Sequence, residues 1–280
     1  MLNISCIDIP IKPKIINLII SGGGGIGGMW GLGTLYYIKK LEKLNIIKIS
    51  TISGSSIGSI LGAHYLNNSL EEFEQILRSA IKYVRTHKSY KNLKNIIFNN
   101  KTKFNLNKLN NKLLVRYIHD GKYTIQKHFD SNDALMTALY NSSYIPFLLE
   151  DKLFNDNCCD AMFPFIFIEN LNKTHDSLYI KLEINSLIRK KEYEIEKTIN
   201  SGMAEANSFF YFNKSNKLSF ISKWHYSQFF LHRLKEFILI ICYLLLKKYN
   251  SSTFKNYLPF QINNCFKNIF LDTTKLLAFS

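Results

Sequence analysis

The chain has 280 residues, of which 46% are apolar, and its formal net charge is +15. This length and apolar fraction suffice for one large folded domain, with or without an extension. The positive charge indicates attraction to anionic membranes or to nucleic acid, although abundant Asn, Lys and Ile also point to an AT-rich coding bias. No helix-turn-helix, zinc-finger spacing or RNA-binding aromatic motif is present, so we expect no nucleic-acid partner.

The five cysteines are odd in number, and their spacing fits neither a zinc site nor a disulfide framework. Residues 1–12 lack the basic start and apolar region of a secretory signal peptide. We therefore expect a reducing, cytoplasmic location and no metal or cofactor. The neighbouring Cys158 and Cys159 are expected to be small buried residues rather than ligands.

Two buried strands, at residues 15–20 and 47–52, are each followed by a glycine-rich turn and then a helix. The expected helices cover residues 29–44 and 57–67, since their apolar residues recur at helical spacing. This strand–turn–helix order predicts a parallel sheet with both turns on one edge, where ligands of open α/β sheets bind.

The next 145 residues are expected to contain further helices and strands, with one irregular basic insertion. Ser69 to Glu72 form a capping box that predicts a helix from residue 70. Residues 86–104 have the composition either of a lid or of a solvated insertion. The remaining expected elements are a basic amphipathic helix at 107–119, a strand at 122–126, a helix capped by Ser131 through 140, strands at 165–168 and 178–184, and a helix at 190–213.

The character of the sequence changes at residue 224. Residues 237–246 are ten consecutive apolar residues with basic flanks, which is about half of what a membrane-spanning helix needs. A core helix and an interfacial anchor both fit this pattern. We predict a domain at residues 14–222 and a helical extension at 223–280 that associates with membranes.

The turn that follows the second strand reads Gly54-Ser55-Ser56-Ile57-Gly58 and fits the G-x-S-x-G nucleophile elbow. A serine at such a turn needs nearly bare backbone two positions before and after it. Only Ser56 meets this requirement, because Ser55 has Ser53 and Ile57 at those positions. The alternative is an ordinary turn between a strand and a helix.

The first turn contains an uninterrupted run of four glycines, residues 22–25, followed by Ile26, Gly27 and Gly28. Gly23, Gly25 and Gly28 match the dinucleotide pattern G-x-G-x-x-G, but the second strand lacks the ribose-binding acid that this pattern requires. The alternative is an oxyanion hole built from the backbone N–H groups of Gly24 and Gly25. We favour the oxyanion hole, because the second turn places a serine nearby.

These two motifs, in this order, resemble those of the patatin-like phospholipases. That family carries G-G-G-x-[R/K]-G, then G-x-S-x-G, and then a late D-G pair, which Asp160 matches here. The resemblance implies a three-layer α/β/α fold with a mainly parallel sheet. It also implies a lipid acyl hydrolase with a Ser–Asp dyad, Ser56 as nucleophile and Asp160 as general base.

Two positions depart from the family pattern. Gly27 replaces the basic residue of the first motif, and Ala161 replaces the glycine after the aspartate, which disfavours a positive φ there. Asp151 and Asp156 are rival bases, and Asp160 can instead be an ordinary solvated acid. Apolar Met162 and Phe163 beside Asp160 would raise its pKa into the range of a useful base.

The expected reaction is calcium-independent release of fatty acid from phospholipid at an anionic membrane surface. His175, His225 or His232 could complete a triad in the chain order Ser, acid, His, but a dyad needs none of them. The main alternative is a weakened family member that binds lipid or a protein partner without turnover. A nucleotide-binding protein is a more distant one.

Overall fold

The computed structural model describes residues 12–87, 89–98, 102–146, 148–150, 152–162, 166, 175–183 and 192–250. Within this part of the chain, seven strands form one sheet in the order β4-β3-β2-β1-β6-β7, and β5 also pairs with β3. The strands are β1 (Lys14–Ile20), β2 (Ile47–Ser55), β3 (Leu113–His119), β4 (Lys122–Gln126), β5 (Cys158–Asp160), β6 (Asp176–Ile180) and β7 (Leu218–Phe220).

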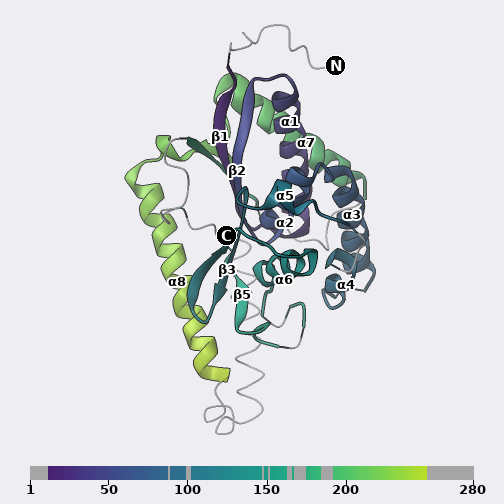
Figure 1. Ribbon diagram of the computed structural model, residues 1–280, viewed down its shortest axis with the longest axis vertical. Helices are drawn as coiled ribbons and strands as arrows, with labels where there is room; N and C mark the ends of the chain where they lie inside the picture. Colours follow the sequence, from purple (N-terminus) through teal and green to yellow (C-terminus); the bar gives the residue numbers. More distant parts are fainter. Residues whose placement is uncertain are drawn as a thin grey trace.

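The helices lie on both sides of this sheet (Figure 1). They are α1 (Gly24–Lys43), α2 (Ile57–Asn67), α3 (Leu70–His87), α4 (Leu93–Phe98), α5 (Leu106–Leu109), α6 (Asn132–Ser142), α7 (Glu192–Phe212) and α8 (Tyr226–Asn250), with a short 3-10 turn η1 (Ile221–Lys223) before α8. The helices from α1 to α7 cover one face, and α8 runs along the other (Figure 1). The three-layer α/β/α fold that the motifs predict is thereby confirmed.

The central strands are parallel and the outer ones antiparallel. β1 pairs in parallel with both β2 and β6, and β2 pairs in parallel with β3. β4 and β5 pair with β3 in antiparallel fashion, and β7 does so with β6. Both glycine-rich turns therefore leave the carboxyl ends of neighbouring parallel strands, as the sequence predicts.

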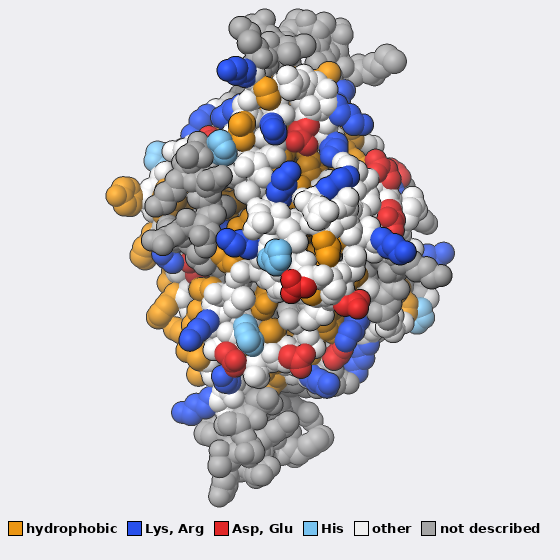
Figure 2. All heavy atoms as spheres, viewed as in Figure 1, with side chains coloured by type: hydrophobic (Ala, Val, Ile, Leu, Met, Phe, Trp, Pro, Cys, Tyr) orange, Lys and Arg blue, Asp and Glu red, His pale blue; other side chains and the backbone are white. Residues whose placement is uncertain are grey.

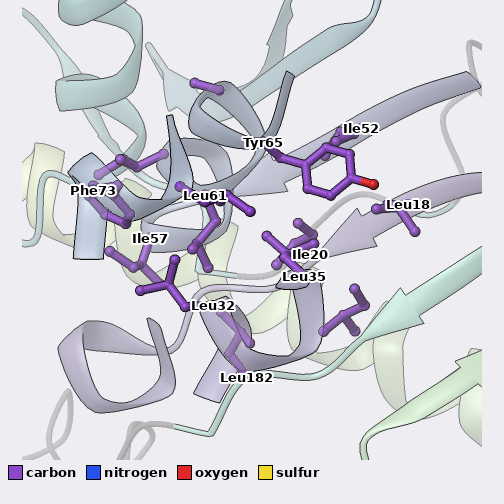
Figure 3. Close-up of a cluster of buried hydrophobic side chains, with 14 of the residues drawn as sticks. Leu18, Ile20, Leu32, Leu35, Ile52, Ile57, Leu61, Tyr65, Phe73 and Leu182 are labelled. Atoms are coloured by element: carbon purple, nitrogen blue, oxygen red, sulfur yellow. The ribbon is translucent and has the colours of Figure 1, made fainter. Parts of the chain in front are cut away.

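Apolar side chains from four elements fill the space between the sheet and the larger helical layer. Leu18 and Ile20 of β1 and Ile52 of β2 meet Leu61 and Phe73 from α2 and α3 (Figure 3). All five side chains are buried. The strands thus read as continuous apolar runs, as expected where both faces of a parallel sheet are covered.

The helices α1 and α7 cross at unusually short range. A Cβ placed on Gly202 of α7 would overlap the carbonyl oxygen of Trp30, and one on Gly33 of α1 would overlap that of Ile199. The hydroxyl of Thr34 donates to the Trp30 carbonyl across one helical turn. Bare backbone at the crossing is therefore what allows α7 to seat on α1.

Replacing Gly202 by Ala should consequently destabilise the fold. We expect a loss of about 1–3 kcal/mol in the free energy of unfolding, because the added methyl group meets rigid backbone and the helices must move apart. Denaturant unfolding followed by circular dichroism measures this. Ser201→Ala changes an exposed neighbour on the same helix, and an equal loss in that variant would contradict the explanation.

Several predicted elements are confirmed and others are corrected. The strand β4 and the helices α2, α6 and α7 lie where expected, and the hydroxyl of Ser131 accepts from Ala134 N–H at the start of α6. α1 begins at Gly24 instead of residue 29, β6 ends at Ile180, and α4 lies within the expected irregular stretch. Of the expected strand at 165–168, only Ile166 lies within the described residues, and it is in a turn.

The predicted helix at residues 107–119 is wrong. Its first residues form the single turn α5, and Leu113–His119 form the strand β3, with six successive buried residues. A central strand buried on both faces shows no alternation, so its apolar run resembles one turn of an amphipathic helix. The helix predicted from residue 70 is confirmed as α3. The Ser69 hydroxyl, however, contacts His64 Nδ1 at 2.9 Å, and Glu72 accepts from Thr102.

The helix α8 contains the apolar residues 237–246 and packs one side against the sheet. Tyr243 Oη donates to the carbonyl of Asn157 at 3.0 Å, and Tyr123 Oη donates to the carbonyl of Glu236. No helix among the described residues is long and apolar enough to cross a membrane. The domain boundary between residues 222 and 223 remains a prediction.

Candidate active site

Ser56 occupies a strained turn between β2 and α2. It is the residue before the first turn of α2 and has φ 55° and ψ −135°, a positive φ that L-residues rarely adopt. Such backbone conformations cost about 1–3 kcal/mol and persist where the surroundings enforce them. The turn therefore has the geometry that the G-x-S-x-G motif predicts for its serine.

The glycines of this motif lie where the chain crosses itself. A Cβ on Gly54 would come within 2.5 Å of the Gly58 backbone, and a Cβ on Gly58 within 2.6 Å of the carbonyl oxygens of Ile20 and Ser21. These are backbone atoms that cannot turn aside. The packing thus requires glycine two positions before and two positions after Ser56, as the motif predicts.

The strand β3 aligns Ser56 with Asp160. Ser55, at the end of β2, pairs with Arg116, whereas Asp160, at the end of β5, pairs with the next residue, Tyr117. β4 occupies the other edge of β3, so β2 and β5 share one edge and meet end to end. Ser56 and Asp160 therefore lie at the junction of two strands that are far apart in sequence.

Asp160 is buried and lies within hydrogen-bonding distance of Ser56. Burial raises the pKa of Asp160 to about 7, while the Met162 N–H and the Ser56 side chain, both hydrogen-bonded to its carboxylate, oppose the rise. The Met162 N–H donates to Asp160 Oδ1 at 2.7 Å. An acid whose pKa is close to neutrality can exchange a proton with a neighbouring hydroxyl.

Ser142 holds the backbone of the elbow, a role that the sequence motifs do not reveal. The Ser56 N–H donates to both Ser142 Oγ and the Ser142 carbonyl at 3.0 Å, and Ser142 Oγ donates to the Arg116 carbonyl at 2.6 Å. The side chain of Ser142 is completely buried. The elbow is thus tied through Ser142 to the same strand that aligns Asp160.

The glycine-rich loop runs directly beside Ser56. A Cβ on Gly22 would approach the Ser56 Cβ to 3.1 Å, and the Gly22 N–H donates to the Met162 carbonyl at 3.1 Å. The helix α1 begins at Gly24, which has φ 61°. The first N–H groups of a helix, here those of Gly24 and Gly25, have no intrahelical acceptor and carry partial positive charge.

The other glycines of this loop are required by close packing. A Cβ on Gly23 would overlap Leu182, one on Gly28 would come within 2.8 Å of the Ile57 side chain, and one on Gly27 within 2.6 Å of the Glu183 carbonyl oxygen. At Gly27, where the family pattern has a basic residue, the backbone of Glu183 thus occupies the space that a side chain would enter.

The second departure, Ala161, is accommodated by the next residue. The positive φ expected after the aspartate is found at Met162, with φ 52°, instead of at Ala161. The Asp160 side chain bonds the N–H two residues on, which stabilises this turn without glycine. Phe163, the other expected apolar neighbour, lies outside the described residues.

Asp156 and the three candidate histidines have surroundings other than the Ser56 turn. Asp156 is exposed in the turn before β5, and Asp151 lies outside the described residues. His175 precedes β6 and so lies at the opposite end of the parallel strands from Ser56. His225 is exposed, and His232 packs edge-on against Tyr179.

Behind the elbow, the face of the sheet that α8 covers carries a buried polar cluster. The Arg116 guanidinium is fully buried and donates to Ser53 Oγ. Burial lowers the pKa of Arg116 to about 9, and the Glu236 carboxylate of α8 opposes this. Burial also raises the pKa of Glu236, against the opposing charges of Arg233 and Arg116. A cationic side chain of β3 and an anionic side chain of α8 thus influence each other in the space between the sheet and α8.

The described residues contain no group of acids, histidines and cysteines able to hold a metal ion. Cys158 and Cys159 are buried, as predicted, and burial raises the pKa of both thiols.

Together, the fold and this geometry define an α/β protein with a serine at a strand-to-helix elbow and a buried carboxylate beside it. Residues 19–124 match the family model described as Patatin-like phospholipase, so this segment of the chain is similar to that family. That family consists generally of hydrolases acting on lipid esters. The matched segment includes both glycine-rich turns and Ser56 but ends before Asp160. A comparison with curated proteins gave no match.

Proposed function

We propose that this protein is a lipid acyl hydrolase that cleaves fatty-acyl esters of phospholipids through Ser56 and Asp160. The observation that carries the proposal is the hydrogen bond between the Ser56 side chain and a buried carboxylate with a pKa of about 7. A nucleophile within reach of such a base, on a strained elbow, is the arrangement that acyl transfer requires.

In this mechanism the ionised Asp160 accepts the Ser56 hydroxyl proton while Ser56 Oγ attacks the ester carbonyl carbon. The backbone N–H groups of Gly24 and Gly25 stabilise the oxyanion, an interaction worth about 10²–10³ in rate for a single donor in a known hydrolase. The protonated Asp160 then returns its proton to the departing alcohol, which leaves an acyl ester on Ser56.

The second half of the reaction reverses these roles. Asp160 removes a proton from water, the resulting hydroxide attacks the acyl-enzyme carbonyl, and the Ser56 oxygen leaves with the proton held by Asp160. Fatty acid and free enzyme are the products. No step in this sequence requires calcium.

Binding of lipid or a partner without turnover is the second candidate. It is favoured by Gly27, since the basic residue of the family motif is replaced at a position where the Glu183 backbone leaves no space for a side chain. A phosphate-contacting or loop-bracing cation at that position is therefore missing. The net charge of +15 supports an anionic phospholipid surface as the partner in either case, with peripheral association from the cytoplasm as the corresponding location.

Fatty-acid release from mixed phospholipid vesicles, with a calcium chelator present, tests the proposal. We expect Ser56→Ala to lose activity by about 10⁴-fold or more. Ser55→Ala, which changes the buried serine that the steric argument rejects, should retain activity. Equal activity of wild type and Ser56→Ala would exclude Ser56 as nucleophile. No release by wild type from phospholipid, lysophospholipid or neutral lipid, with vesicle binding intact, would favour the second candidate.

A further inference from the structure

The helix α8 has two faces of opposite character. One face is buried against the sheet and carries His232, Glu236, Tyr243 and Leu246. The other, which we call the outer face of α8, carries large exposed apolar side chains at a helical spacing. It comprises Phe230, Leu234, Phe237, Ile241, Leu244 and Leu245.

The exposure of this face is considerable. The side chains of Phe230 and Phe237 are 67% and 63% exposed. In Figure 2, hydrophobic side chains gather along the edge of the molecule where Figure 1 shows α8. Scattered exposed apolar residues are normal, but a contiguous apolar stripe on a long helix indicates an interaction surface.

A rotation of α8 about its own axis cannot bury the outer face. Its opposite side is fixed by the Tyr243 hydrogen bond to Asn157 and by the Lys247 ion pair with Asp120 at 3.1 Å. Burying the outer face instead would break these contacts and also the hydrogen bond from Tyr123 to the Glu236 carbonyl. The stripe must therefore face outward in the folded domain.

The charges on α8 identify the chemistry of the partner. Its single acidic residue, Glu236, is buried, while Arg233, Lys235, Lys247 and Lys248 are exposed. An apolar stripe with cationic residues at its borders suits a surface that is anionic above and apolar below. A second copy of this chain fits less well, because a two-fold contact would place the same cations against each other.

We propose that the outer face of α8 is a docking surface for anionic phospholipid bilayers. The helix lies in the plane of the interface, with Phe230 and Phe237 among the acyl chains and the lysines at the headgroups. The choice of phospholipid rests on the proposed function, but docking itself requires no turnover. Binding measured in the Ser56→Ala background therefore separates the failure of docking from the failure of catalysis.

The first test compares two pairs of aromatic residues with similar exposure. Full-length Ser56→Ala protein is sedimented with phosphatidylcholine vesicles that either contain or lack phosphatidylglycerol. We expect Phe230→Gln/Phe237→Gln to lower partitioning onto the anionic vesicles about tenfold or more. Tyr211→Gln/Phe212→Gln, at the exposed end of α7, should leave it unchanged; Tyr211 and Phe212 are 45% and 61% exposed.

A second measurement reports contact directly. In Phe237→Trp the added tryptophan should shift its emission to the blue on binding and be quenched by brominated acyl chains, whereas in Phe212→Trp it should not. Unchanged melting curves would show that these variants fold.

Three results would overturn the proposal. The first is the absence of wild-type binding to either kind of vesicle. The second is equal binding by the Phe230/Phe237 and Tyr211/Phe212 variants. The third is a change from dimer to monomer, or a loss of stability without vesicles, when the outer face is made polar and vesicle binding is unaffected. That result would assign the face to a second copy or to residues 251–280.

Discussion

Replacing Asp160 by Asn should abolish hydrolysis and at the same time stabilise the protein. The loss of activity follows from the loss of the base, and we expect about 10³–10⁴-fold in kcat. In the wild type, the rate should rise with pH through about 7, because only the ionised carboxylate accepts the serine proton and burial raises the pKa of Asp160 to about 7. Initial rates of fatty-acid release from pH 5 to 9 measure both effects.

The stabilisation follows from the same pKa. Asp160 has a folded pKa of about 7, well above the ordinary value near 4 of an unfolded chain, so folding favours its neutral form. Its favourable contribution is complete below about pH 4 and is lost as the pH rises through about 7. Three pKa units correspond to about 4 kcal/mol. Asn stays neutral and keeps the acceptor for Met162, so Asp160→Asn should be more stable than wild type at pH 8 and nearly equal at pH 4.

Denaturant unfolding at the two pH values tests this expectation, and Asp156→Asn is the matched control. Asp156 lies four residues earlier, in the turn before β5, and is exposed. Its substitution should change neither the rate nor the pH dependence of stability. If Asp160→Asn kept its activity while Asp156→Asn lost it, the base would be reassigned to Asp156.

Restoring the family's basic residue by Gly27→Arg should reduce activity instead of improving it. A Cβ at this position would lie 2.6 Å from the Glu183 carbonyl oxygen, so the loop and the chain after β6 must separate. We expect about 1–3 kcal/mol of destabilisation. A shift of about 1 Å in the loop beside Ser56 can cost about 10²-fold in rate. Thermal melting and vesicle hydrolysis measure the two effects.

Gly27→Ala is the control that separates the steric effect of this substitution from the effect of its charge. It introduces the same Cβ clash without the charge, so it should show most of the loss of both stability and activity. If Gly27→Arg were instead as active as wild type, or more active, the Glu183 backbone would have to yield easily. The absence of a basic side chain at position 27 would then be the loss of a catalytic aid and not a consequence of packing.

The parts of the site that depend on local sterics could be predicted from the sequence. The spacing of Gly54, Ser56 and Gly58 specifies a turn in which backbone passes backbone, and the structure has that turn. The run of glycines likewise predicts close approach, and Gly22 and Gly28 both meet neighbouring chain. These steric requirements involve residues that are close together in the sequence, so they appear as a local sequence pattern.

The parts that depend on long-range pairing leave no such pattern. The sequence of β3 predicts a helix, because a strand buried on both faces shows no alternation. Ser142 anchors the elbow through a partner 86 residues away, and no local pattern marks it. No local pattern marks the charge interaction between Arg116 and Glu236 either, since only the fold brings α8 behind β3.

The alignment of β2 and β5 along one edge of β3 has a consequence for how the protein acquires activity. Ser56 and Asp160 are adjacent only if both strands pair with β3 in the native register, and a shift by one residue would turn every side chain of the shifted strand to the other face. These pairings join segments remote in sequence, which form slowly because loop closure precedes them. During refolding, helix content should therefore return before any catalytic competence does, and activity should report the completed sheet.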